Sequence, residues 1–324
     1  MQGNILILSA GRRVSLVKAF MQSASQYSPD IKIMTGEANP YLSSACQISH
    51  GSVKTPRIND VEFIPFIQHY CEQWNIKIIV PTIDTELLVL ARNKKVFENT
   101  GIYIMVPDED FVSICRNKRL THSYFLEKGI SVAREQLKEN LTYPLFAKPE
   151  DGSSSNQLFY APDAGHLPPF VLEDPRFMLL EYLDRKWYDE YTADTYFNRD
   201  GIICCIVPRQ RLETRGGEIS KGFTSKNFLV NWIKNKFTHI PGARGCITMQ
   251  FFVHRETNEV KGIEINPRFG GGYPLSYFAG ADYPKWIIEE YLYKNNISWF
   301  NEWEDHLLML RHDNEIIIHD YQNK

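Results

Sequence analysis

The chain has 324 residues, of which 43% are hydrophobic, 13% aromatic and 23% charged. This composition is typical of a globular protein with a packed core, and the length favours two or three domains. The 36 Lys and Arg against 39 Asp and Glu give a net charge of -3, so charge does not favour nucleic acid or anionic membranes as partners. The longest apolar run, residues 202–207, is too short to span a bilayer.

The opening residues, MQGNILILSAGRR, predict a first strand rather than a signal peptide, because no basic segment and cleavage site precede it. The six cysteines show no C-x-x-C spacing. We therefore expect reduced thiols in or near the core of a cytoplasmic protein, and we expect no zinc site.

The first third of the chain alternates between short apolar runs and segments with helical periodicity. Strands separated by helices indicate βαβ units and a mostly parallel sheet, so the fold class of this part is α/β. The expected strands are 5–9, 31–35, 76–80 and 102–106, and the expected helices are 14–24, 63–74 and 86–97.

Ligands of such sheets bind at the carboxyl ends of the strands, which places Ala10–Arg13 and Thr82–Glu86 at the functional edge. The Gly11-Arg12-Arg13 segment lacks the G-x-G-x-x-G fingerprint of dinucleotide binding. Two interpretations stay open for it: a tight turn between strand and helix, or an anion held at the helix N-terminus with help from Arg12 or Arg13.

From about residue 109 the pattern changes to a mixed α+β arrangement. Residues 108–128 predict two short helices, and the chain is rich in strands from residue 143. We place the first domain boundary between residues 110 and 120.

The segment PLFAKPEDGSSSNQLFY places Lys148 at the end of an apolar strand, followed by a turn with Gly152 and three serines. Backbone N–H groups and hydroxyls of such a turn can close over phosphates, while the lysine neutralises them. A solvated hairpin loop is the alternative. The Walker pattern is absent.

The segment FMLLEYLDRKWYDEY carries an apolar strand into Glu181, Tyr182 and Leu183, and a second strand begins at Glu190. Free backbone groups at the end of a strand can pair with an adenine edge, and a carboxylate can accept hydrogen bonds from two ribose hydroxyls. The alternative is that Glu181 and Glu190 are carboxylates at the rim of a sheet.

The segment CITMQFFVHRETNEVKGIEINPRFGGG predicts a hairpin that pairs residues 247–254 with 260–265. Gln250 then faces Glu264, and Asn266 projects to the same side as Glu264. One carboxylate with amide oxygens suits Mg²⁺ shared with a nucleotide. Arg268, two residues on, can touch a transferring phosphoryl group. A surface hairpin would leave Glu264 and Asn266 unexplained between buried isoleucines.

Together these motifs resemble the ATP-grasp superfamily, and most of all the type found in carbamoyl-phosphate-synthase large subunits. The resemblance covers residues 4–290. It rests on Lys118, the Lys148 segment, Glu181-Tyr182-Leu183, Glu190, Met249-Gln250-Phe251 and Glu264-Ile265-Asn266-Pro267-Arg268.

The resemblance implies an N-terminal pre-ATP-grasp domain at residues 1–112, a lid subdomain at 113–188 and a C-terminal ATP-grasp subdomain with the metal site at 189–324. It also implies ATP and Mg²⁺ (or Mn²⁺) as cofactors. The nucleotide-binding residues would be Lys118, Lys148, Ser153, Ser154, Ser155, Glu181, Tyr182, Leu183 and Glu190.

The resemblance further implies that Gln250, Glu264 and Asn266 ligate the metal. We assign Arg268, Lys148 and Arg211 as the catalytic cations. In the segment PRQRLETRGGEISKG we expect a cationic loop that holds an anionic substrate, with a solvated surface loop as the alternative. The expected substrate-binding residues are Arg209, Arg211, Arg215, Lys221, Gly271 and Gly272.

Two positions depart from many relatives. Asn156 replaces a glycine at the end of the serine loop, and a long linker between Glu181 and Glu190 leaves Asp189 as a competitor for the ribose role. The chain also lacks a second ATP-grasp half and a glutaminase-like cysteine site, which argues against complete carbamoyl-phosphate synthesis.

The implied reaction is phosphorylation of a carboxylate by ATP, followed by attack of an amine or thiol on the acyl phosphate. The competing functions are a phosphotransferase, and a regulatory or partner subunit of a carbamoyl-phosphate-synthase-like complex. A Rossmann dehydrogenase is disfavoured. The expected partners are a small carboxylate and an amine, with no nucleic acid or membrane.

Two further expectations concern histidines and the C-terminal segment. The histidines lack metal-ligand spacing, so we expect surface or capping positions. The segment LLMLRHDNEIIIHDY predicts a hairpin that turns at Asp313-Asn314. It would form a sheet edge or a contact in a homodimer.

Overall fold

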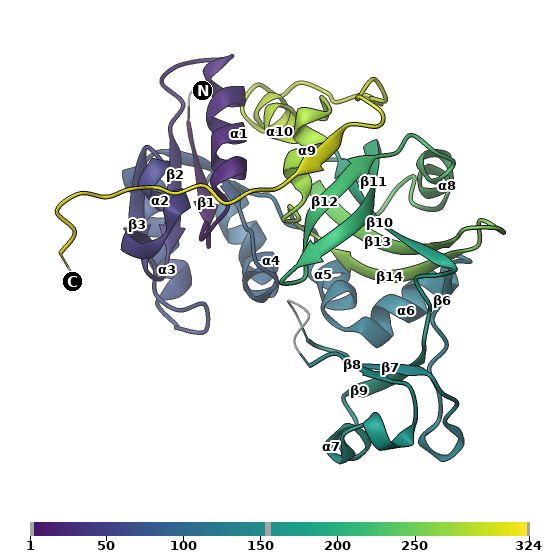
Figure 1. The fold of residues 1–324 in the computed structure, drawn as a ribbon. Helices are drawn as coiled ribbons and strands as arrows, with labels where there is room; N and C mark the ends of the chain where they lie inside the picture. The colour runs from purple at the N-terminus through teal and green to yellow at the C-terminus, as the bar shows by residue number, and fades with distance from the viewer. Residues whose placement is uncertain (1–2, 153–156, 323–324) are drawn as a thin grey trace.

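The computed structural model describes residues 3–152 and 157–322, and its strands form three sheets (Figure 1). A five-stranded parallel sheet comes first in the chain. A seven-stranded mixed sheet and a three-stranded antiparallel sheet follow. The chain therefore combines an α/β first part with an α+β second part, as its sequence predicts.

The five-stranded sheet has the order β3-β2-β1-β4-β5. Most of its elements are the expected ones, and residues 76–80 form a strand with the predicted bounds. The strand expected at 31–35 lies two residues later. The elements are β1 Asn4–Leu8, α1 Val14–Ser25, β2 Ile33–Glu37, η1 Pro40–Leu42, α2 Ser44–Ile48, β3 Gly51–Lys54, α3 Phe63–Gln73, β4 Ile76–Val80, α4 Asp84–Glu98 and β5 Tyr103–Ile104.

Three short elements of this part, η1, α2 and β3, have no counterpart in the sequence predictions. Strand β3 is polar at alternate positions and carries one buried residue, Val53, so it offers no apolar run. Helix α2 has five residues and begins because the Ser43 hydroxyl accepts a hydrogen bond from the Cys46 N–H. Segments this short leave too little periodicity to be found in a sequence.

Strand β1 lies at the centre of its sheet, and its two faces belong to two different hydrophobic cores. Ile5 and Ile7 pack in the large core that includes β10 (Tyr188–Phe197), β11 (Ile203–Arg215), β13 (Gly245–His254) and helix α10 (Tyr283–Tyr291). Leu6 and Leu8 pack against α3 and α4. Side chains of a strand alternate between faces, so one strand joins both cores. The N-terminal sheet is thereby fixed to the rest of the molecule.

The three-stranded sheet has the order β8-β7-β9 and a small core of its own. Two short helices precede it, close to the predicted 108–128 region, and Figure 1 shows them beside the seven-stranded sheet. The elements are α5 Glu109–Arg116, α6 Lys118–Glu127, β6 Ser131–Val132, η2 Lys138–Asn140, β7 Leu145–Pro149, β8 Phe159–Ala161, η3 Ala164–His166, α7 Pro169–Glu173 and β9 Phe177–Glu181.

The seven-stranded sheet has the order β15-β12-β11-β10-β13-β14-β6. It contains the predicted hairpin, in which Gln250 pairs with Glu264 across strands β13 and β14. The remaining elements are β10 Tyr188–Phe197, β11 Ile203–Arg215, β12 Glu218–Thr224, α8 Leu229–Lys236, β13 Gly245–His254, β14 Val260–Asn266, α9 Tyr273–Phe278 and β15 Leu308–Leu310.

The predicted C-terminal hairpin is wrong. Only Leu308–Leu310 form a strand, and the described residues after 310 form neither helix nor strand. Ile316, Ile317 and Ile318 are exposed, so no apolar face holds a returning strand against β15. The segment instead leads away across the N-terminal part (Figure 1).

The division into 1–112, 113–188 and 189–324 remains a proposal. Residue 112 lies inside α5, and β6 from the middle segment joins the seven-stranded sheet. None of the described helices has the length and apolar character needed to cross a membrane. The cysteines are free, and all are buried except Cys115, which is partly exposed.

Candidate active site

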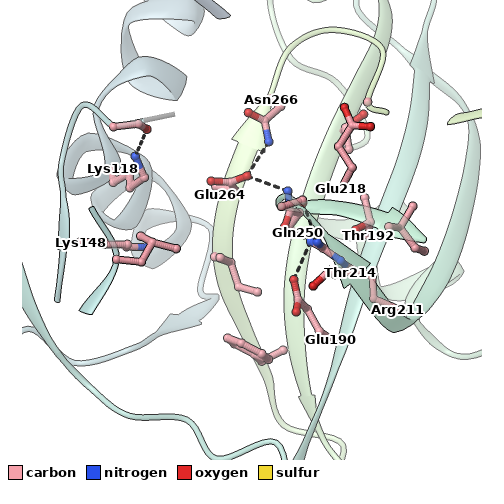
Figure 2. A pocket seen from close by; sticks show the side chains of 18 of the residues that line it. Lys118, Lys148, Glu190, Thr192, Arg211, Thr214, Glu218, Gln250, Glu264 and Asn266 are labelled. Carbon is pink, nitrogen blue, oxygen red and sulfur yellow. Dashed lines mark hydrogen bonds and ion pairs between the residues drawn. The ribbon is translucent and has the colours of Figure 1, made fainter. Parts of the chain in front are cut away.

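A cavity of about 690 Å³ lies where the three sheets meet. Its walls come from the N-terminal strand ends, helix α6, the three-stranded sheet and strands β10 to β14. Figure 2 shows Lys118 and Lys148 on one side and Gln250, Glu264 and Asn266 on the other. The predicted site residues that line it are Lys118, Lys148, Glu181, Tyr182, Leu183, Glu190, Arg209, Arg211, Gln250, Glu264, Asn266, Arg268, Gly271 and Gly272.

Ser153, Ser154 and Ser155 lie outside the described residues, as does Asn156. Gly152, just before residues 153–156, and Leu158, two residues after them, contribute to the cavity wall. The chain therefore reaches the cavity where the predicted phosphate-covering loop begins and ends.

Strand β10 presents alternate residues to the cavity. Glu190 and Thr192 line it, whereas Asp189 projects to the other side and pairs with Arg255 at 2.9 Å. Both Asp189 and Glu190 line a neighbouring pocket of about 180 Å³, but of the two only Glu190 also lines the main cavity. The Glu190 carboxylate lies 2.7 Å from Arg211 Nη1.

Glu264 is the centre of a small polar cluster on the β13–β14 hairpin. Its Oε1 accepts hydrogen bonds from Gln250 Nε2 at 2.6 Å and from Asn266 Nδ2 at 2.8 Å (Figure 2). The Gln250 Oε1 accepts from Arg211 Nη1 at 2.9 Å. The strand register thus brings the three predicted metal ligands together.

The protein side chains of this cluster can supply only some of the oxygen ligands that a hard cation needs. No group of three His, Cys, Asp or Glu side chains within residues 3–152 and 157–322 is arranged to hold a metal. One carboxylate and two amides can supply oxygen ligands to Mg²⁺, which takes its remaining oxygens from water and phosphate. The amide groups would have to turn their oxygens toward the ion.

Two lysines face this cluster. Lys148 ends strand β7 and is only 7% exposed. Burial lowers the pKa of Lys148 to about 8; Glu264 opposes this shift, and Lys118 adds to it. Burial also lowers the pKa of Lys118, whose Nζ donates a hydrogen bond to the Gly152 carbonyl.

His122 is a cavity residue that the sequence analysis missed, and the expected surface or capping position is wrong for it. It lies one turn after Lys118 on α6, lines the cavity and is 6% exposed. Burial, followed by the charges of Lys148 and Lys118, lowers its pKa to about 3. Because His122 lies four residues after Lys118 on the same helix, the spacing could have indicated that both side chains share one face.

Glu181 ends strand β9 and lies 2.7 Å from Lys261 Nζ. Its backbone N–H donates to the Arg134 carbonyl, and the Arg134 N–H donates to its carboxylate at 3.1 Å. Tyr182 and Leu183 follow in the cavity wall. The side chain of Glu181 is therefore engaged by protein groups at the edge of the cavity.

Arg268 contacts the N-terminal domain. It donates two hydrogen bonds to Asp84, from Nε at 2.8 Å and from Nη2 at 2.6 Å. Burial opposes ionisation of Arg268, but Asp84 outweighs it and raises the Arg268 pKa. Asp84 belongs to the predicted 82–86 edge and lines the cavity.

The Gly11-Arg12-Arg13 turn also reaches the cavity. The Gly11 N–H donates to the Glu37 carboxylate at 2.9 Å, so a protein acid occupies this part of the turn. Arg12 and Arg13 nevertheless line the cavity, and Arg13 lies 3.5 Å from Glu218. The backbone of this segment therefore forms the tight turn of the first interpretation, and the side chains of Arg12 and Arg13 face the cavity.

The predicted cationic loop is a hairpin of strands β11 and β12, whose turn contains Gly216 and Gly217, both with positive φ. Arg209 and Arg211, two apart, line the cavity. Arg215 and Lys221 lie outside it, because Asp313 at 3.0 Å and Glu213 at 2.7 Å pair with them near the exposed end of the hairpin. The substrate roles predicted for Arg215 and Lys221 are therefore not supported.

Gly271 and Gly272 leave room for protein side chains. A Cβ on Gly272 would lie 2.2 Å from Arg209 Nη1, and one on Gly271 would lie 2.5 Å from the Glu218 carboxyl carbon. The space beside these two glycines, which we expected a substrate to approach, is therefore partly filled by the side chains of Arg209 and Glu218.

Comparison with known proteins places this geometry in a known fold. Residues 5–105 match the family model of the PylC-like N-terminal domain. Residues 173–309 match the model described as ATP-grasp in the biosynthetic pathway with Ter operon. No curated protein sequence matches the chain significantly.

Solved structures of three enzymes share the fold. The biotin carboxylase domain of Hydrogenobacter thermophilus 2-oxoglutarate carboxylase has a TM-score of 0.73 and 12% identity over 95% of this chain and 74% of that one. For the L-amino acid ligase of Bacillus licheniformis, the TM-score is 0.68 and the identity 16%, over 90% and 74%.

For the N5-carboxyaminoimidazole synthetase of Staphylococcus aureus, the TM-score is 0.67 and the identity 15%, over 89% of this chain and 77% of that one. The first family model matches residues in the part with the five-stranded sheet, and the second matches residues in the part with the seven-stranded sheet. The chain thus carries a match to a PylC-like N-terminal domain at residues 5–105 and a match to an ATP-grasp domain at residues 173–309.

Proposed function

We propose that this protein is an ATP-dependent ligase that activates a carboxylate as an acyl phosphate for attack by an amine or a thiol. One observation carries the proposal: Lys118 and Lys148 face Glu264, Gln250 and Asn266 across a single cavity. Triphosphate and a hard cation need these two kinds of group on opposite sides. The family matches support the same class of reaction.

The nucleotide of this proposal is Mg-ATP. The H. thermophilus structure of this fold holds Mg-ADP and ADP, and the S. aureus structure holds ADP. In our chain Lys118 and Lys148 would neutralise the phosphates, and Glu190 would bind the ribose. Tyr182 and Leu183 would lie against the adenine.

Gln250, Glu264 and Asn266 would hold Mg²⁺, which when bound supplies charge neutralisation for the transferring phosphoryl group. Met249-Gln250-Phe251, in which glutamine takes the place of an acidic ligand, is the feature that supports the carbamoyl-phosphate-synthase-like subtype. The subtype is part of the proposal.

The protein groups act mainly by positioning. A carboxylate oxygen of the substrate attacks the γ-phosphorus, and the bond from that phosphorus to the bridging oxygen breaks, so ADP leaves. The amine nitrogen then attacks the acyl carbon, loses a proton and expels phosphate. Arg268, held in place by Asp84, stabilises negative charge on the phosphoryl oxygens.

Turnover with hydroxylamine tests the proposal. The protein is mixed with Mg-ATP, hydroxylamine and a panel of amino acids and small carboxylates, and both ADP and hydroxamate are measured. ADP together with hydroxamate for one acid is the expected result. ADP without hydroxamate would instead indicate a phosphotransferase, and ATP binding without either product would indicate a regulatory or partner subunit.

We also propose a homodimer, as expected from the sequence. The H. thermophilus biotin carboxylase domain crystallised as a dimer, which supports such an assembly for the fold. Light scattering of the purified full chain would measure its mass, and a monomer at micromolar concentration would contradict this part of the proposal.

A further inference from the structure

Five arginines line the part of the cavity wall between the N-terminal strand ends and the glycine segment 270–272. We call Arg12, Arg13, Arg116, Arg209 and Arg268 the arginine cluster. Two cavity-lining carboxylates, Asp84 and Glu218, lie among them. Arg268, Arg116 and Arg13 each lower the pKa of Asp84 against the effect of burial, so all three are near it.

The charges of this region do not balance. Arg209 is compensated by the buried Asp194, at 2.8 Å. The four other arginines of the cluster interact with Asp84 and Glu218, and Arg268 also interacts with Glu264, which is proposed to bind the metal. Arg311 adds a further cation at 2.9 Å from Glu218. A positive surplus therefore remains on this wall, although the whole chain has a net charge of -3.

The nucleotide does not account for this surplus. Mg-ATP is a dianion, and Lys118 and Lys148 on the opposite wall can balance it. Arg211 is already paired with Glu190 at 2.7 Å. Arg268 is proposed to contact the transferring phosphoryl group, and the other arginines of the cluster are thus available to a second molecule in the cavity.

Arg209 gives an independent sign of a ligand. Its side chain is 1% exposed, and two hydrogen bonds to Asp194 fix its orientation. Asp194 is itself held by Thr248 and Ser276. Arg209 Nη1, however, has no hydrogen-bond partner among residues 3–152 and 157–322. A buried N–H donor without a partner is costly, and an anionic ligand would satisfy it.

The glycine segment brings two of these cations together. A Cβ on Gly271 would lie 2.8 Å from Arg13 Nη1, and one on the next residue, Gly272, would lie 2.2 Å from Arg209 Nη1. Arg13 and Arg209 therefore contact neighbouring residues of one short segment. Guanidinium groups fixed in this way are suited to carboxylate or phosphate oxygens.

We propose that the acid activated in this cavity carries a second anionic group, a carboxylate or a phosphate, which the arginine cluster binds. This inference rests on the proposed ligase function and narrows its substrate class. A monocarboxylate would leave part of the cluster uncompensated. A dicarboxylate or a phosphorylated acid places one anion at the site of phosphoryl transfer and the other on Arg13 and its neighbours.

Binding measurements test the inference without turnover. Calorimetry on the full chain with Mg-ADP bound compares succinate, glutarate and adipate with their monoamides, and 3-phosphoglycerate with glycerate. We expect at least one dianion to bind about tenfold more tightly than its monoanion, because a hydrogen bond to a charged group is lost in the monoanion. The dicarboxylate and phosphate arms distinguish the two kinds of anion.

Variants identify the residues responsible. Arg13→Gln should remove the preference for the dianion, and Arg13→Lys should restore part of it. Arg57→Gln, an equal change of charge at an exposed residue of the same domain, should leave the preference intact. The ADP affinity of all three variants should stay unchanged, which would show that the folded nucleotide site is preserved.

Equal affinity for dianions and monoanions throughout the panel would overturn the inference, and so would an unchanged preference in Arg13→Gln. The proposed function has a separate readout. A dianion preference without hydroxamate formation would contradict the ligase while it supports the arginine cluster. Hydroxamate formation from a monocarboxylate alone would support the ligase function and contradict the role of the arginine cluster.

Discussion

Lys148 shows how one residue combines stability and function. An ammonium group at 7% exposure loses hydration, and the structure lowers its pKa to about 8 rather than providing it with a carboxylate in direct contact. Glu264 helps to retain the charge from across the cavity. Nucleotide phosphates bound beside Lys148 would favour its charged form, so ATP binding and protonation of Lys148 should be coupled.

We therefore predict that ATP affinity falls as the pH rises through about 8. Below that value Lys148 is protonated in the free protein, and above it binding must take up a proton. Calorimetry in two buffers with different ionisation enthalpies would measure this uptake. Lys148→Arg should bind ATP with little pH dependence, because arginine stays charged.

Removal of the side chain should have a larger effect. We expect Lys148→Ala to weaken ATP binding by about 10- to 100-fold, the effect of losing charged hydrogen bonds to phosphate. An ATP dissociation constant equal to that of the unmodified protein would exclude the phosphate role.

Glu264 is the one carboxylate in its cluster. We predict that Glu264→Ala lowers Mg-dependent ATP turnover by at least about 100-fold, because the remaining amides cannot hold the ion alone. ADP release with increasing Mg²⁺ is the measurement, and circular dichroism checks the fold. Glu256→Ala, in the exposed turn of the same hairpin, should retain full turnover. Normal Mg²⁺ dependence in folded Glu264→Ala would refute the metal assignment.

At the scale of elements, strongly patterned segments were predictable and short polar ones were not. The β13–β14 hairpin follows from its alternating apolar residues, and its register placed Gln250 opposite Glu264 as predicted. The β11–β12 hairpin was misread as a loop because charged residues dominate its outer half. Only tertiary pairing with β10 makes Arg209 a buried residue there.

Partners distant in sequence could not be predicted for the site. Arg268 lies 184 residues from Asp84, and no local pattern indicates that they meet. His122 lay on a helix with a visible periodicity, but whether its face met solvent or the cavity depended on how three sheets come together. The chemistry of each local motif could be predicted from the sequence, whereas the positions of the motifs relative to one another could not.

The turn from β4 to α4 depends on Glu86. This carboxylate is fully buried and accepts hydrogen bonds from the N–H groups of Thr82 and Ile83 and from the Ser9 hydroxyl. It thereby connects the ends of β1 and β4, next to Asp84 in the cavity wall. The geometry of the edge of the sheet depends on a residue that does not touch the cavity.

We predict that Glu86→Ala lowers the free energy of unfolding by about 1–3 kcal/mol, because buried backbone donors lose their acceptor. Glu86→Gln should lose less, since its amide oxygen still accepts from the two N–H groups. Urea unfolding curves would measure both. Equal midpoints for Glu86→Ala and the unmodified chain would argue against this role.

At the scale of the whole molecule, the cavity is assembled from the parts of the chain that carry each of the three sheets. The helix starts that follow strands β1 and β4 supply Arg13 and Asp84, the three-stranded sheet supplies Lys148, and the seven-stranded sheet supplies Glu264. Each part contributes to a hydrophobic core, but no single part contains all the charged groups of the cavity. The proposed chemistry therefore depends on how the parts are placed.

The Asp84–Arg268 pair tests this dependence. We predict that Asp84→Ala destabilises the protein by about 3 kcal/mol, because Arg268 is left largely buried without its partner. It should also lower kcat, since Arg268 loses its orientation. A double-mutant cycle with Arg268→Ala, measured by thermal unfolding, should show that the double variant loses less than the sum. Strict additivity would mean that the two side chains act independently.

The same pair restricts the exchange of segments between related proteins. An N-terminal domain taken from a protein of similar fold would dock on the rest of this chain with the correct shape if its α1 helix matched. It would still inactivate the chimera if its β4–α4 turn lacked an acid at the position of Asp84. Natural recombination and laboratory shuffling at this boundary should therefore succeed only where that carboxylate and Arg268 are inherited together.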